Sequence, residues 1–329
     1  MPQLSPNQKK LNRNNKMLRS FKFLLLALAC DRGASFLPTN SLAGTTRTNL
    51  VELQASATAV QTKDVESLLA SNRKTVDSLA SVSEDVSEIE RLRFAMGFDT
   101  PSEAEHALRK ALSYRKGEGK SVIDAAQEAY ETASIGGGWD NEVVRNSAPH
   151  ASLINKYITS NNIVTVSTAS GDLVYVIRAS LIDDKKMMDN VSVQQLSDFF
   201  MYVKEIHSLV ANQRSETNGR LCEVILANDI TGVRKAPDSR FSKALSSSSS
   251  QYDKLYPTLA GPTMILNLPF ILQAFVALFK PLFPKTVQAK LKFTKAPVLA
   301  SMSELTPLAT RGNVKNQLFM KEIDALLKK

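Results

Sequence analysis

The sequence predicts an α/β protein in which a small helical unit precedes a domain built on a mixed β-sheet. The sheet is predicted by short apolar, β-branched runs that alternate with helical segments, at residues 163–166, 173–179, 221–227 and 263–268. The first two runs are joined by Ala169–Asp172, which has the composition of a hairpin turn. An antiparallel pair inside an otherwise alternating strand–helix pattern indicates a mixed sheet.

A long helix is predicted over residues 191–214. Ser192 and Gln195 have the spacing of a capping box, and the apolar residues that follow lie near one helical face. Helical periodicity also covers Ile89–Tyr130, with Pro101 as a start signal for a helix inside it. The serine run Ser246–Ser250 is interpreted as a polar helix start or a loop.

The length of the chain and the distribution of its charge indicate a large core and argue against a nucleic-acid-binding protein. A chain of 329 residues with 43% hydrophobic residues can bury a large core, with appendages around it. The net charge is +9, but residues 1–62 hold eight Lys or Arg and two acidic residues, a net +6, which leaves +3 for the rest. No basic stripe with interleaved aromatics follows, so nucleic-acid binding is not expected.

Residues 1–62 are predicted to be a targeting leader. If Met17 is the operative start, residues 17–35 read as a signal peptide with basic Arg19 and Lys22 and a short apolar stretch. Residues 36–62 are rich in small and hydroxylated side chains, as in a transit peptide. Ala34–Pro38 resembles the motif of bipartite leaders in algae with complex plastids. We therefore expect a plastid protein, with an ordinary secreted protein as the alternative.

The segment from Tyr252 to Phe293 carries a series of short motifs in a fixed order. They are Tyr256-Pro257, Ile265-Leu266-Asn267-Leu268-Pro269, Lys280-Pro281-Leu282-Phe283 and Lys290-Leu291-Lys292-Phe293. This order and spacing resemble the CRAL-TRIO family of lipid-binding and lipid-transfer proteins, which includes phosphatidylinositol- and tocopherol-transfer members. The chain departs from the family at Thr258-Leu259, where Glu-Arg is usual.

The resemblance extends to the helical unit. Arg91-Leu92-Arg93-Phe94 and Tyr114-Arg115-Lys116 are similar to motifs of the family's N-terminal helices, although the register of Arg91 and Arg93 is ambiguous by two positions. The implied division is a helical region at 63–135, a CRAL-TRIO domain at 145–296 and a C-terminal tail at 297–329, with a helix at Asn313–Leu327.

The family implies an apolar lid helix over a lipid pocket. Pro262 and Pro269 interrupt the uncharged run from Leu259 to Phe279, so it is not read as a membrane span. Phe270–Phe279 is the expected lid, or gate helix, with Phe275, Val276 and Phe279 facing cargo or membrane. The residues expected to line the pocket are Val174, Val176, Phe200, Val203, Ile225, Ile265 and Phe270.

Lys280 and Arg91 are the candidate ligands for a lipid headgroup. The family's Lys-Pro lysine contacts the headgroup phosphate in members that bind inositol lipids, and a lysine at this place can also simply reach solvent. Those members also use a Glu about nine residues before the Tyr-Pro proline. Here that stretch is Ser246–Ser250, so recognition of inositol lipids is left open.

Catalytic and metal-binding patterns were not found. Gly117–Ser121 looks like the end of a P-loop, but the first glycine of the motif and a preceding strand are missing. His106, His150 and His207 lack the spacing of a zinc site, and His207 is interpreted as a core-edge or surface residue. No metal and no cofactor other than bound lipid cargo are expected.

The predicted function is binding of a phospholipid or an isoprenoid and its transfer between membranes, or its presentation at a membrane, by a non-enzymatic monomer. The expected partners are that lipid and a transient membrane surface. The alternative is a divergent CRAL-TRIO adaptor, a regulatory protein-interaction module that exchanges no lipid.

Overall fold

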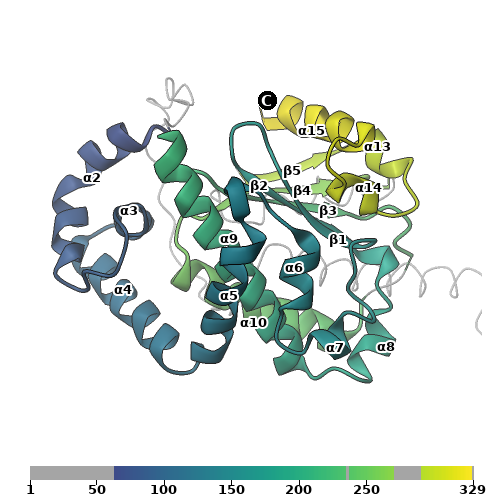
Figure 1. Cartoon of the computed structure of the whole chain (residues 1–329), viewed down its shortest axis with the longest axis horizontal. Coiled ribbons are helices and arrows are strands. Elements are labelled where there is room, and N and C mark those ends of the chain that lie inside the picture. The colour runs from purple at the N-terminus through teal and green to yellow at the C-terminus, as the bar shows by residue number, and fades with distance from the viewer. Residues whose placement is uncertain (1–62, 235–236, 270–289, 328–329) are drawn as a thin grey trace, which may run out of the picture.

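A computed structural model describes residues 63–234, 237–269 and 290–327, and a five-stranded sheet lies at its centre (Figure 1). β1 and β2 are antiparallel, and every later neighbouring pair is parallel. The predicted α/β fold with a mixed sheet is confirmed. In spatial order the strands are β1 (Ile163–Ser167), β2 (Leu173–Arg178), β3 (Val224–Asp229), β4 (Ala260–Leu266) and β5 (Leu291–Thr294).

The predicted hairpin joins β1 to β2. The amide of Thr168 donates to the carbonyl of Asp172 at 2.9 Å, and the amide of Gly171 donates to the carbonyl of Thr168 at 3.1 Å. Gly171 has φ 94°, a conformation that costs glycine little and other residues much more. The turn therefore sets the register of the antiparallel pair.

The long helix α9 (Val193–Asn218) connects β2 to β3. Its first turn has the predicted capping box, in which Ser192 and Gln195 each accept from the backbone amide of the other. The helix stops at Gly219, which takes the left-handed conformation with φ 62°. These two ends define a helix of 26 residues, and many of its side chains are buried.

The helix α10 (Ser239–Leu255) connects β3 to β4, and the serine run lies inside it rather than in a loop. Asp238 caps this helix by accepting from the amide of Arg240. Ser248 and Ser249 are buried on the same helix as Phe241 and Tyr252. The larger apolar residues on either side set the buried face, so the serines are carried into the interior.

β4 begins at Ala260, three residues before the predicted start, and includes Pro262. Val224 pairs with Ala260 and Leu226 pairs with Thr263, so β4 holds one extra residue at this point. Such a bulge accommodates a proline, which has no amide hydrogen to donate to the neighbouring strand. Pro262, which interrupts the uncharged run in the sequence, thus marks an irregularity inside the strand.

Short helices complete the side of the sheet that faces α9. Helix α5 packs against α9, and Gly117–Ser121 joins α4 to α5 without a preceding strand, so the context of a P-loop is absent there. These elements are α5 (Lys120–Ala133), η1 (Ile135–Gly137), α6 (Asn141–Asn146), α7 (Ala151–Ile154), η2 (Ala179–Leu181) and α8 (Asp184–Met188).

The N-terminal helical unit consists of α2 (Val65–Ala80), α3 (Glu88–Gly97) and α4 (Pro101–Lys116), which lie together at one end of the molecule (Figure 1). The start signal at Pro101 is confirmed; the cap is Thr100, which forms a capping box with Glu103.

Arg93 fastens this unit to the sheet domain. Its buried guanidinium donates to Asn212 Oδ1 at 2.7 Å, to the carbonyl of Cys222 at 2.6 Å and to that of Thr258 at 3.3 Å. Burial lowers the pKa of Arg93 to about 10, so it stays charged at neutral pH.

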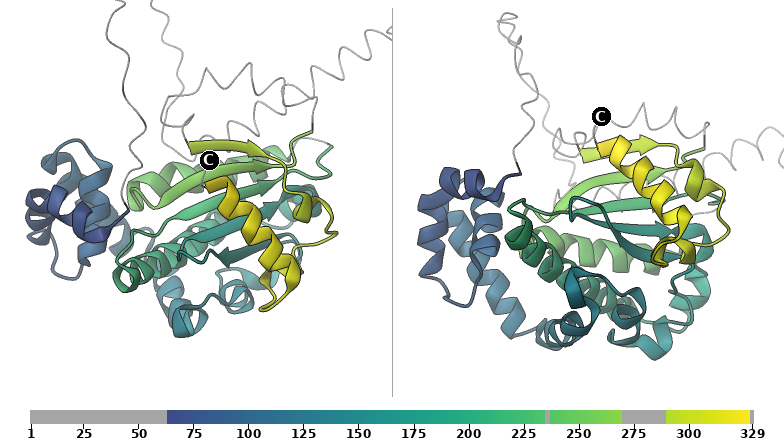
Figure 2. Two further views of the ribbon diagram at one scale, coloured as in Figure 1. Left: turned by 90° about the horizontal axis from the view of Figure 1, so that it is seen from above. Right: turned by 45° about the horizontal axis from the view of Figure 1, so that its top comes forward.

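The segment after β5 covers the other face of the sheet. It forms α13 (Pro297–Ala300), α14 (Thr306–Ala309) and α15 (Val314–Leu327), and Figure 2 shows α15 lying across the strands on the side away from α9 and α10. Leu299, Phe319 and Ile323 are fully buried against β-strand residues. The helix predicted at Asn313–Leu327 is confirmed, and it packs on the sheet.

Candidate functional site

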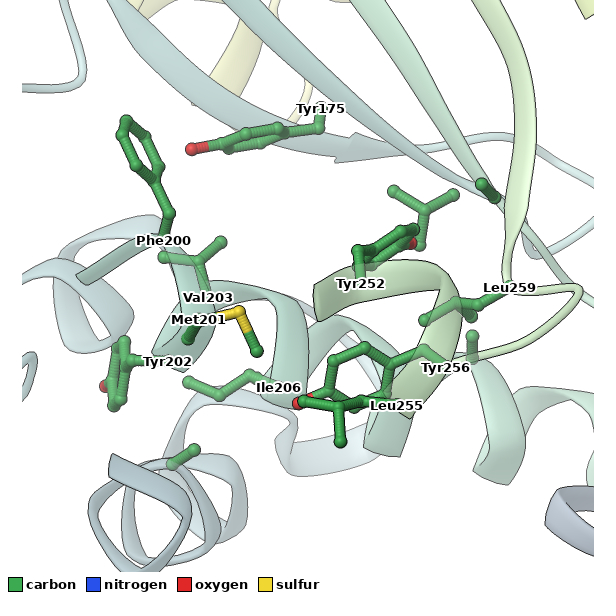
Figure 3. Close-up of a cluster of buried hydrophobic side chains, with 14 of the residues drawn as sticks. Tyr175, Phe200, Met201, Tyr202, Val203, Ile206, Tyr252, Leu255, Tyr256 and Leu259 are labelled. Carbon is green, nitrogen blue, oxygen red and sulfur yellow. The ribbon is translucent and has the colours of Figure 1, made fainter. Parts of the chain in front are cut away.

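A cavity of about 450 Å³ lies between the sheet and the helices α9 and α10. We call the side of the sheet that borders it the cavity face, and the side under α13–α15 the back face. Most of the wall is apolar: the sheet contributes Ile177 and Leu226, and α9 contributes Phe200 and Val203. Figure 3 shows Tyr175 on the sheet side, opposite Phe200 and Val203 of α9 and Tyr252 of α10.

His207 forms part of the wall and is fully buried, in contrast to the predicted core-edge or surface position. Its Nε2 lies 3.0 Å from Thr165 Oγ1, and its ring lies 4.8 Å from Trp139 and 5.1 Å from Tyr175 between centroids. Burial, with the nearby cations Lys204 and Arg214, lowers the pKa of His207 to about 3. The imidazole is therefore neutral and held in place by its neighbours.

Lys204 and the buried serines form a polar strip along the helices. Lys204 Nζ donates to Ser248 Oγ at 3.4 Å and lies 4.8 Å from the ring centroid of Tyr252. Ser249 lies beside Ser248 in the wall. The serine run thus supplies hydroxyl groups inside the cavity. In the family that the sequence resembles, the members that bind inositol lipids have a glutamate in the corresponding part of the sequence.

Asp229 lies at the end of β3, where the wall meets the back face. Its carboxylate accepts from Arg178 Nε at 2.5 Å, from Asn267 Nδ2 at 3.0 Å and from the Thr231 hydroxyl at 2.7 Å. Arg178 in turn donates to the backbone carbonyls of Leu299 and Met302. This buried ion pair ties the edge of the cavity to the C-terminal segment.

Two polar atoms of the wall have no hydrogen-bond partner. They are the hydroxyl of Tyr175 and Nδ2 of Asn228, and both are buried. A buried donor without a partner costs about 1–3 kcal/mol of stability. Since most buried polar groups in proteins are satisfied, this pair is a feature of the cavity that packing alone does not explain.

The structure divides the predicted pocket residues between the two faces. Phe200 and Val203 line the cavity, whereas Val174, Val176 and Ile225 point to the back face and pack with the C-terminal helices. The prediction is therefore corrected for these three, because neighbouring residues of a strand point to opposite faces. Ile265 pairs with Asn228 in register, so it belongs to the cavity face, but it does not line the cavity.

The other predicted site residues fall elsewhere. Phe270, Phe275, Val276, Phe279 and Lys280 lie outside the described residues. Arg91 is on α3, where it donates to the carbonyl of Val86 at 2.7 Å, and it is not part of the cavity wall. Its predicted role as a headgroup ligand is therefore not supported by this cavity.

The wall residues that the sequence did not reveal are mainly Tyr175, Asn228 and His207. Tyr175 lies between the predicted Val174 and Val176, and Asn228 lies three residues after the predicted Ile225, so both point to the opposite face from the predicted residues. His207 is four residues from Val203 on α9, and four residues on a helix return to the same face.

The arrangement can hold an apolar molecule with a small polar part. Within the described ranges, no three His, Cys, Asp or Glu side chains lie close enough together to hold a metal ion. Among the helices described, none is both long and apolar enough to cross a bilayer.

The comparison with family models agrees with the resemblance seen in the sequence. The family model of the CRAL/TRIO domain matches residues 160–308. A solved structure titled "Crystal structure of Sfh5" is similar in fold, with 11% sequence identity and a TM-score of 0.46. The aligned region covers 81% of this chain and 98% of the Sfh5 chain. No curated protein sequence matches the chain significantly. The part of the chain that matches the CRAL/TRIO domain, residues 160–308, contains the sheet and the residues that line the cavity.

Proposed function

We propose that the chain binds a hydrophobic lipid in the cavity and transfers it between membranes, or presents it at a membrane, without catalysing a reaction. The observation that carries this proposal is the cavity itself. About 450 Å³ is left open between the sheet and α9 and α10, and its wall is mainly apolar with a few polar groups. Pockets of about 300–1,000 Å³ with this composition are typical of small-molecule sites.

The physical need for such a protein follows from the hydrophobic effect. Burying one methylene is worth about 0.8 kcal/mol, so a 16-carbon chain favours an apolar environment by on the order of 12 kcal/mol. Spontaneous desorption of such a lipid from a membrane is therefore slow. A protein that offers an equivalent apolar cavity lowers the cost of leaving the bilayer.

The cavity also favours lipid binding over the adaptor alternative. A domain that only binds protein partners has no need of an internal space, and its core gains stability from being filled. Here wall residues such as Leu226 and Leu245 are only partly buried. An interior left open next to apolar side chains supports a ligand-binding role.

Transient membrane contact, a monomeric state and location in a plastid belong to the same proposal. The plastid assignment rests on residues 1–62, which lie outside the described residues. Fusing residues 1–62 to a fluorescent protein tests it in an alga with complex plastids. Fluorescence in the plastid is expected, and fluorescence in the medium would support the secreted alternative.

The direct test of lipid binding uses the full-length chain. The purified protein is incubated with a total lipid extract, recovered, and extracted with organic solvent for mass spectrometry. One or two lipid species enriched to near-stoichiometric amounts are expected. Lipid content equal to that of an unrelated control protein would contradict the proposal and favour the adaptor.

A further inference from the structure

The two residues that carry the unpaired polar atoms of the wall lie on adjacent strands, on the cavity face. In the register of the parallel pair, Tyr175 is opposite Leu226 and Ile177 is opposite Asn228. Tyr175 and Asn228 are therefore diagonal neighbours on adjacent strands, with their side chains on the same side of the sheet. Figure 3 shows the Tyr175 ring between the sheet and α9, with its oxygen directed toward Phe200.

Both atoms can donate a hydrogen bond. The amide nitrogen of Asn228 is a donor only, and the phenol of Tyr175 stays protonated because burial raises its pKa above the ordinary value. Of the buried side-chain polar atoms without a partner in the described ranges, these are the two that belong to residues of the cavity wall. A ligand that satisfies them must present hydrogen-bond acceptors.

The two carboxylates of the wall have partners inside the protein. Asp229 is paired with Arg178, and the carboxylate of Asp184 accepts from the amides of Lys185 and Asp238. Lys204 contacts Ser248 and the Tyr252 ring. Arg234 is exposed, and the imidazole of His207 is neutral. An anionic group beside Tyr175 and Asn228 would meet neutral donors and the neutral His207 ring there, and it would lose its hydration.

We propose that the cavity takes an uncharged lipid whose oxygen-bearing end, a carbonyl or a hydroxyl, is buried against Tyr175 and Asn228 and accepts a hydrogen bond from each. The inference rests on the proposed function, because it concerns the ligand of the same cavity. It places the apolar chain of the lipid along Leu226, Phe200 and Val203, which line the rest of the wall.

The test compares three probes of equal chain length: a long-chain ketone, the corresponding alkane and the corresponding carboxylate. Each is delivered from cyclodextrin to the full-length chain, and the bound amount is measured by mass spectrometry of the extract. The wild-type protein is expected to bind the ketone more tightly than the alkane, and the carboxylate less tightly than the ketone.

The variants Tyr175→Phe and Asn228→Leu remove one donor each and keep the size of the side chain. Each is expected to reduce the ketone-to-alkane affinity ratio by about 2- to 10-fold, the worth of one neutral hydrogen bond. Tyr202→Phe is the matched control, since the Tyr202 hydroxyl donates to the carbonyl of Val144 and Tyr202 is not part of the cavity wall. Its ratio is expected to equal that of the wild type.

An unchanged ratio in Tyr175→Phe would overturn the inference, since the two donors would then be satisfied by water alone. The carboxylate binding more tightly than the ketone would overturn it too. If Asn228→Leu fails to fold, the Tyr175→Phe variant alone still tests the inference. In each of these outcomes the alkane still binds, so the proposed function survives; if no probe binds, the proposed function itself fails.

Discussion

The two faces of the sheet are made by the same strands but are packed in different ways. On the back face, Val174, Val176 and Ile225 meet Leu299, Phe319 and Ile323 of the C-terminal segment in an apolar layer. On the cavity face, the alternate residues of β2 and β3 border an open space of about 450 Å³ and include two unpaired polar atoms.

The difference shows how the domain separates stability from ligand binding. A filled apolar layer holds the strands together without help from a ligand, so the opposite face can remain incompletely packed. Incomplete packing of the cavity face lowers stability, and the contacts on the back face of the same strands offset that loss. Changes on the back face should therefore act on folding, and changes on the cavity face should act on lipid binding.

The largest expected effect comes from Arg178, which joins the two faces. Arg178→Met leaves the buried Asp229 carboxylate without its guanidinium and frees the carbonyls of Leu299 and Met302. Loss of one partner of a buried ion pair typically costs about 3–5 kcal/mol. Urea unfolding monitored by circular dichroism is expected to show this loss.

The double variant Arg178→Met with Asp229→Leu serves as its control. Replacing both members of a buried ion pair by apolar residues is often neutral, so much of the lost stability should return. A single variant that loses less than about 1 kcal/mol would show that Arg178 does not hold the two faces together.

A matched pair of truncations compares the faces directly. Leu266 on β4 is fully buried in the back face, whereas Leu226 on β3 borders the cavity. Leu266→Ala is expected to reduce the free energy of unfolding by about 2–5 kcal/mol, and Leu226→Ala by about 2 kcal/mol or less, because Leu226 already faces open space. Equal losses in urea unfolding would contradict the contrast between the faces.

A matched pair of enlargements tests the same contrast in the opposite direction. Ala227→Leu adds volume to the packed back face and is expected to cost about 1–3 kcal/mol of stability. Ser249→Leu adds volume to the cavity and should cost less than about 1 kcal/mol while reducing the amount of bound lipid. If the Ser249→Leu variant binds as much lipid as the wild type, the lipid does not occupy this cavity.

The smallest expected effect concerns pH. The pKa of His207 is about 3 in the folded protein, against about 6.5 when unfolded. The unfolded chain therefore takes up a proton as the pH falls below 6.5 while the folded chain does not, so stability is lost with falling pH. Between pH 7.5 and 5.5 this loss is about 1.3 kcal/mol.

His207→Gln should remove that part of the pH dependence, and His106→Gln, at an exposed position, should keep it. Urea unfolding at the two pH values measures both. An identical pH dependence in the wild type and His207→Gln would show that His207 is not held neutral by its surroundings.

The elements of the fold were readable in the sequence to a large extent. The β-branched runs marked β1–β4, and Ser192 with Gln195 marked the start of α9. The faces were not readable, because β2 reads Leu-Val-Tyr-Val-Ile-Arg with apolar residues at successive positions. A strand covered on both sides loses the alternation that identifies its inner face.

The candidate site was limited by the same ambiguity. The apolar character of Val174 and Val176 predicts that they line the pocket, whereas Tyr175 between them lines the cavity. The serines of α10 are interpreted from the sequence as a polar helix start or a loop. Serine is usually exposed, and only the packing of α10 on α9 buries Ser248 and Ser249. Long-range packing of this kind leaves no local pattern in the sequence.

The central claim is that a lipid occupies the space between the cavity face and the helices α9 and α10. Photo-crosslinking of the full-length chain with a long-chain lipid that carries a diazirine, followed by peptide mapping, tests it most directly. Crosslinks are expected in β2, β3, α9 and α10, at wall residues such as Phe200, Leu226 and Tyr252. Crosslinks confined to α13–α15, or none above an unrelated protein, would contradict the claim.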